Sequence, residues 1–182
     1  MIISMNLKKY RKCKLWVNET GGLPFIKAEN AIEKDVPSNI KKATEVVQIA
    51  LELSLPRNSS YYALVGFECK SGNNQSNTKI TVLMSKEKLN YSSETLSDSY
   101  DKVIMGISEE YGQSVLESAI ETINEMGEFT YGEITFNVGA YAECGSSKAV
   151  FAQVTRILIK LSQVDLLNMT EVEIQDKIES MF

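Results

Sequence analysis

Residues 130–161 have the sequence TYGEITFNVGAYAECGSSKAVFAQVTRILIKL, which predicts a strand followed directly by a helix. Ile134, Phe136 and Val138 alternate with polar residues, as in a strand that buries one face. Either Ser146 or Ser147 can begin the helix, because serine is a preferred N-cap residue. Apolar residues then recur at helical spacing at positions 150, 154, 157, 158 and 161.

Three further helices are expected outside this stretch. One runs from Ser108, a good N-cap residue, to Gly127, a good C-terminal stop. A short terminal helix follows Thr170, which can form a capping box with Glu173. Residues 38–54 also carry apolar side chains at helical spacing and predict an N-terminal helix.

The remaining segments predict strands and loops. Residues 13–17 predict a first strand. The β-rich runs 61–69 and 78–84 flank the turn-forming sequence SGNNQSN and predict a hairpin. Residues 85–102 are polar without periodicity and predict a long surface loop.

Length and composition favour a single domain spanning residues 1–182. Hydrophobic residues make up 43% of the chain, enough for a sizeable core, and no repeat or linker divides it. The 24 acidic and 19 basic residues give a net charge of −5, so the chain as a whole does not attract a polyanion. RNA binding would therefore require a local basic patch.

Several kinds of site are disfavoured by the residues present. The chain has no histidine, which removes the Ser-His-Asp triad, the Cys-His dyad and the usual zinc ligand sets. Cys13, Cys69 and Cys144 form no CxxC pair and fit reduced thiols. No apolar run approaches the ~20 residues of a membrane-spanning helix. We therefore expect a cytoplasmic protein with no metal, no cofactor, no catalytic residues and no membrane partner.

Five short motifs between residues 103 and 162 occur in a recognisable order. They are Met105-Gly106, Glu110-Tyr111, Gly139-Ala140-Tyr141, Ser146-Ser147 and Phe151. This order resembles domain IV of translation elongation factor G, which has a glycine pair at the first position. The resemblance implies an α+β fold like ribosomal protein S5 domain 2, with helices packed on one face of the sheet and a left-handed crossover. The 38–54 helix would be an additional N-terminal helix.

The resemblance also implies where such a protein acts. In elongation factor G the loop after this strand reaches the ribosomal decoding centre, and a histidine stands at its tip. Here Ala142 occupies that position and Glu143 follows it, so no imidazole offsets the repulsion between a carboxylate and phosphates. The motif GxxxxGK[ST] is absent, so no nucleotide is expected. The loop-tip residues that match the family are Tyr141, Ala142, Glu143, Ser146 and Ser147, of which the two serines could cradle a phosphate or simply cap the helix.

A basic cluster near the N-terminus supplies the patch that RNA binding would need. Cations and aromatic side chains are interleaved there, and such segments can follow phosphates and stack on bases. A short charge run can also be no more than a solvated surface. The candidate RNA-binding residues are Lys8, Lys9, Arg11, Lys12, Lys14 and Trp16.

Two functions follow from these observations. The first is a stand-alone, non-catalytic elongation factor G domain IV-like protein that binds RNA or the ribosome. The second is a protein–protein interaction or regulatory module, such as an inhibitor or antitoxin-like partner, that reuses the fold without binding RNA. An enzyme is not expected, because the segment GAYAECGSS at residues 139–147 lacks the glycine density of a phosphate-binding loop.

Overall fold

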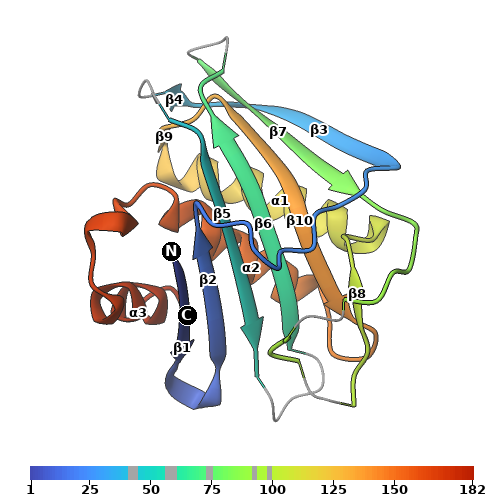
Figure 1. Ribbon diagram of the computed structural model, residues 1–182. Helices are drawn as coiled ribbons and strands as arrows, with labels where there is room; N and C mark the ends of the chain where they lie inside the picture. The colour runs from blue at the N-terminus through green and yellow to red at the C-terminus, as the bar shows by residue number, and fades with distance from the viewer. Residues whose placement is uncertain (41–44, 56–60, 73–75, 92–93, 98–99) are drawn as a thin grey trace.

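A mostly antiparallel, eight-stranded sheet forms the centre of the computed structural model, which describes residues 1–40, 45–55, 61–72, 76–91, 94–97 and 100–182 (Figure 1). The strand order is β1-β2-β5-β6-β10-β7-β3, and β8 pairs with the end of β10. These strands are β1 Ile2–Asn6, β2 Lys12–Val17, β3 Asn30–Pro37, β5 Val47–Ser54, β6 Tyr62–Lys70, β7 Asn77–Met84, β8 Val103–Met105 and β10 Glu133–Ala142. A separate parallel pair joins β4 Asn39–Ile40 to β9 Glu128–Phe129. The helices are α1 Glu109–Met126, α2 Lys148–Leu161 and α3 Glu171–Glu179, with short 3-10 turns η1 Lys8–Tyr10 and η2 Leu166–Asn168.

Helices α1 and α2 cover one face of the sheet, and the residues at their ends explain their limits. α1 begins after Ser108, whose side chain makes no capping hydrogen bond. It ends at Gly127, whose φ of 71° lies in the left-handed region that favours glycine. α2 begins after Ser147, whose hydroxyl accepts a hydrogen bond from the Val150 N–H. α1 packs on β3 and β7, and α2 packs on β5 and β6. Both of these predicted helices are confirmed.

The predicted terminal helix is confirmed as α3, which lies beside β1 (Figure 1). The Thr170 hydroxyl accepts the Glu173 N–H, and the Glu173 carboxylate accepts the Thr170 N–H at 2.8 Å, which completes the capping box. Gln175 Nε2 donates to the Asn6 carbonyl at 3.0 Å. The C-terminal helix is thereby attached to the edge strand at the other end of the chain.

The predicted strand in the 130–161 stretch is confirmed as β10, and it contributes to cores on both faces of the sheet. Ile134 and Phe136 are fully buried against the helices. A bulge between Phe136 and Val138 changes the register, so Val138 and Ala140 lie on the opposite face, here called the outer face. The segment after β2 crosses the outer face in Figure 1, and its Leu23 joins the small apolar core there.

The predicted helix over residues 38–54 is wrong wherever the chain is described. Residues 39 and 40 form β4, the last eight residues form β5, and residues 41–44 lie outside the described residues. β5 lies inside the sheet, and both of its faces are buried. Ile49 and Leu51 are buried on the helix side, and Ala50 is buried on the outer side. The alternation that marks a strand is therefore hidden, and the apolar spacing fits a helix equally well. The expected additional N-terminal helix is not found in the described residues.

The strands predicted at 61–69 and 78–84 are confirmed as β6 and β7, but their pairing as a hairpin is wrong. β10 lies between them, antiparallel to β6 and parallel to β7. Ile134 is opposite Cys69 on one side and opposite Ile80 on the other. β6 and β7 are therefore consecutive in sequence but separated in the sheet by a strand that comes much later in the chain. Residues 73–75 between them lie outside the described residues.

The strand predicted at 13–17 is confirmed as β2, whereas the edge strands were not predicted. β1 is short, and β3 carries Glu33, Lys34 and Asp35, which suit an exposed sheet edge and hide its strand pattern. The segment predicted as a surface loop at 85–102 contains no helix or strand in its described residues, apart from a single β-bridge at Asn90.

The connection between the parallel neighbours β7 and β10 runs through α1. In Figure 1 both strands run downward, β7 lies to the right of β10, and α1 lies behind the sheet. The chain descends along β7, returns behind the sheet through α1 and descends again along β10, to the left of β7. A connection of this sense is left-handed. Such a crossover is uncommon, because about 98% of these connections are right-handed.

Candidate nucleic-acid interface

The basic cluster lies on the hairpin formed by β1 and β2, here called the basic hairpin (residues 1–18). Lys8 and Lys9 are exposed in the η1 turn, Lys12 is exposed at the start of β2, and Arg11 is half-buried. Residues 1–18 contain five cationic side chains and no acidic one, although the whole chain has a net charge of −5. The basic hairpin therefore concentrates positive charge in an otherwise acidic chain, and the carboxylate of Glu179 from α3 accepts the Lys8 N–H at its turn.

The other two candidates from this cluster, Lys14 and Trp16, lie on the outer face of β2. Lys14 Nζ is 4.9 Å from the centre of the Trp16 ring, a cation–π contact. Trp16 is only 2% exposed and packs with Leu23 and Ala50. Its ring therefore has no free surface on which a base could stack, and the predicted role of Trp16 in RNA binding is not supported.

A buried carboxylate, which the sequence did not reveal, lies beside Lys14. Glu52 of β5 is opposite Lys14 and is 0% exposed. Its Oε1 accepts hydrogen bonds from the Tyr62 hydroxyl and the Leu96 N–H, both at 2.8 Å. Burial raises the pKa of the Glu52 carboxyl, and the bonds from Leu96 and Tyr62 and the charge of Lys14 oppose that rise. Glu52 therefore holds the segment around Leu96 against the outer face.

Two atoms of this cluster stand out among the buried polar atoms of the described residues. Glu52 Oε2 and Trp16 Nε1 each make no hydrogen bond. Lys14 is opposite Glu52, and Trp16 is opposite Ala50. The side chains of Trp16 and Glu52 are therefore diagonal neighbours on the outer face. An unsatisfied acceptor of this kind adds to the cost of burying the charge on Glu52.

The loop-tip candidates predicted from the resemblance are used mainly for internal contacts. Tyr141 is half-buried, Ala142 is buried and Glu143 is exposed. The Ser146 hydroxyl accepts the Ala142 N–H at 2.8 Å and donates to a strand carbonyl of β6 at 2.6 Å. The Ser147 hydroxyl caps α2. Of the two possible roles of the serines, the structure shows capping and turn closure.

The motifs that carry the resemblance meet in space. The Tyr111 ring stacks on Phe151 with centroids 4.4 Å apart and lies 5.6 Å from the Tyr141 ring. The Gly106 N–H donates to the Gly139 carbonyl at 2.6 Å. These contacts join α1, α2, β10 and the residue that follows β8, so the five motifs pack against one another.

The basic hairpin and the loop after β10 lie at the same end of the sheet (Figure 1). Lys12 is opposite Ser54, Ser54 is opposite Tyr62, and the Tyr62 N–H donates to the Gly145 carbonyl at 2.8 Å. Three strand spacings separate them, which is about 14 Å. One extended ligand can therefore contact both.

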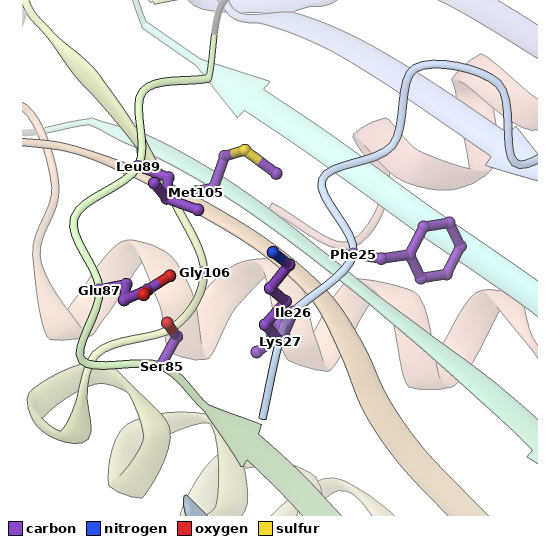
Figure 2. A pocket seen from close by; sticks show the side chains of 8 residues that line it. All are labelled: Phe25, Ile26, Lys27, Ser85, Glu87, Leu89, Met105 and Gly106. Atoms are coloured by element: carbon purple, nitrogen blue, oxygen red, sulfur yellow. The ribbon is translucent and has the colours of Figure 1, made fainter. Parts of the chain in front are cut away.

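The pocket in Figure 2 lies between the Phe25–Lys27 segment and the residues that follow β7. Ser85, Glu87 and Leu89 form one side, and Met105 and Gly106 form another. Its volume of about 50 Å³ has room for one or two waters and not for a nucleoside. This pocket is therefore too small to hold a nucleoside.

Other reactive groups are dispersed. Cys13 and Cys69 are buried and Cys144 is exposed, and none of them forms a disulfide. Burial raises the pKa of the Cys13 thiol, and it raises that of Cys69 to about 12. Over the described residues, no cluster of three or more histidine, cysteine, aspartate or glutamate side chains could hold a metal ion. No helix in this part of the chain has the length and apolarity needed to cross a membrane.

Neither the protein-family models, nor the curated proteins, nor the solved structures include a significant match to the chain.

Proposed function

We propose that this protein is a stand-alone, non-catalytic elongation factor G domain IV-like protein that binds RNA or the ribosome through the basic hairpin. The observation that carries the proposal is the concentration of five cations and no acidic residue in positions 1–18 of an otherwise acidic chain. Phosphate contacts by lysine and arginine supply most of the affinity for nucleic acid and release counterions. A local patch can therefore bind RNA despite the negative net charge.

Two features support the fold likeness within this proposal. The crossover from β7 to β10 has the left-handed sense that the resemblance implies. The matching residues Tyr111, Tyr141 and Phe151 form one aromatic cluster rather than being scattered. The resemblance accordingly concerns packing, and the RNA contacts are assigned to the basic hairpin.

The proposal is tested by co-sedimentation with ribosomes and by binding to rRNA fragments at increasing salt. A triple variant, Lys8→Gln, Lys9→Gln and Lys12→Gln, should weaken binding. It should also reduce the slope of log affinity against log salt by about 2, because each lost phosphate contact removes roughly 0.7.

A matched control carries the same change in charge elsewhere. Lys27→Gln, Lys34→Gln and Lys88→Gln remove three exposed lysines outside the basic hairpin. This control should bind RNA as the wild type does. Absence of binding at about 50 mM salt, or an equal loss in both triple variants, would reject the proposal.

A second function is favoured by the outer surface of α1. This surface carries no cation and six exposed glutamates, counting Glu128 just beyond the helix: Glu109, Glu110, Glu117, Glu121, Glu125 and Glu128. Glu125 pairs with Arg156 at 2.8 Å, and Glu109 lies 3.9 Å from Lys86. Such a surface suits a basic protein partner, as a regulatory or inhibitory module would need.

The two functions are separated by affinity capture with the intact protein as bait. Recovery of a defined protein without rRNA, lost in a Glu117→Lys, Glu121→Lys variant and retained in the basic-hairpin variant, would select the interaction module. Recovery of rRNA with the opposite dependence would select RNA binding.

A further inference from the structure

The turn of the basic hairpin holds two consecutive residues in the left-handed region. Lys9 has φ 57° and ψ 34°, and Tyr10 has φ 63°. Residues other than glycine rarely adopt this conformation, and tight hairpin turns usually place Asn-Gly or Gly-Gly in it. This chain places a lysine and a tyrosine there. Backbone strain that persists at an exposed position points to a use for the side chains it displays.

The backbone on both sides of the turn is held in place. The Leu7 N–H donates to the Arg11 carbonyl at 2.8 Å. The Arg11 guanidinium lies 4.1 Å from the centre of the Phe182 ring, and the Lys8 N–H donates to the carboxylate of Glu179. The backbone that carries the turn is therefore fixed at both ends, which lowers the backbone entropy lost when the turn binds a ligand.

The turn also displays the aromatic ring that the buried tryptophan cannot supply. Tyr10 is 67% exposed, whereas Trp16 is 2% exposed. An exposed ring can stack on an unpaired base, and such stacking tolerates any base because each has a π face. In a duplex the base faces are already stacked on one another, so the ring adds nothing there.

We propose that the turn binds single-stranded RNA, with Tyr10 stacked on a base and the cations at positions 8, 9 and 12 contacting the adjacent phosphates. This inference rests on the proposed function, and it adds the strandedness of the ligand and the residue that selects it. Positive charge alone attracts single strands and duplexes alike. The ring gives the preference for single strands.

The test measures the binding of two labelled RNAs by fluorescence anisotropy, namely an unstructured single strand of roughly 12 nucleotides and a duplex of the same length. Tyr10→Leu should weaken binding to the single strand by about 5- to 150-fold, which corresponds to the usual effect of losing one base stack. It should leave duplex binding within about twofold. Tyr10→Phe keeps the ring and should bind both RNAs as the wild type does.

The outcomes separate this inference from the function on which it rests. If neither RNA binds, the proposed function fails. If both bind through the lysines but Tyr10→Leu changes nothing, or weakens both RNAs equally, only the single-strand inference is overturned.

A Tyr10→Gly variant tests the strain independently. Glycine adopts the left-handed region freely, so the melting temperature should stay equal or rise while binding to the single strand falls. A lower melting temperature with unchanged binding would mean that Tyr10 is retained for packing, and it would overturn the inference.

Discussion

A Glu52→Gln variant should be more stable than the wild-type protein at about pH 8, and the advantage should shrink as the pH falls toward about 4.5. Burial raises the folded-state pKa of the Glu52 carboxyl above its unfolded value, so the folded protein favours the protonated form. The stability linked to that proton is complete below the unfolded pKa and is lost as the pH rises through the folded pKa. Glutamine resembles the protonated acid and keeps an acceptor for Tyr62 and Leu96. Urea unfolding at a series of pH values measures the difference.

Two comparisons make this result specific to the buried carboxyl. Glu68→Gln removes a half-buried carboxylate that lies opposite Gln48 in the same sheet. An equal gain in that variant would assign the effect to net charge instead of burial. Glu52→Leu removes the acceptor as well, and it should cost about 1–3 kcal/mol because the buried Tyr62 hydroxyl loses its partner.

A Phe151→Ala variant should lower the free energy of unfolding by about 3–5 kcal/mol. Phe151 is 0% exposed and lies in the main core on the helix side of the sheet. Its ring stacks on Tyr111, so the substitution leaves a cavity and also removes the aromatic contact between α1 and α2. Denaturant unfolding, with the slope checked for two-state behaviour, measures the loss.

Phe151→Leu is the matched control, because it keeps an apolar side chain and most of the volume. It should cost clearly less than the alanine variant. A loss below about 1 kcal/mol for Phe151→Ala would mean that the core closes around the vacated space, and that this contact is not what joins the two helices.

The helices could be predicted because their signals are local. Ser147 and Thr170 cap the helices that directly follow them, and Gly127 has the backbone conformation that glycine favours at a helix end. The strands at 13–17, 61–69, 78–84 and 133–142 also carried enough β-forming residues to be identified.

The predictions that are wrong concern strands whose burial and pairing depend on residues distant in the chain. The apolar pattern of β5 resembles that of a helix because α2 covers one face of the strand and the segments around Leu23 and Leu96 cover the other. β6 and β7 were paired with each other because they are adjacent in sequence, and nothing within them indicates that β10 separates them. Pairing between distant strands is decided by the whole sheet, which local patterns do not encode.

At the candidate interface, too, features set by neighbouring residues could be predicted, whereas features set by distant segments could not. The cations of the basic hairpin are close in sequence, so the patch could be located from residues 8–14 alone. The burial of Trp16 and Glu52 depends on the segments that cross the outer face, among them the residues around Leu23 and Leu96. The exposure of Tyr10 depends on a strained turn, which the sequence LKKYRK does not predict because it contains no glycine or asparagine.

The central position of β10 has a consequence for the growing chain. Synthesis proceeds from the N-terminus, so β1 to β7 are complete before β10 has been made. Until then β6 and β7 each present an unpaired edge at the place where the sheet must later join. A nascent or truncated chain that stops near Gly127 therefore exposes the unpaired edges of β6 and β7, which can pair with other chains. Only β10, once it is made, pairs with both edges.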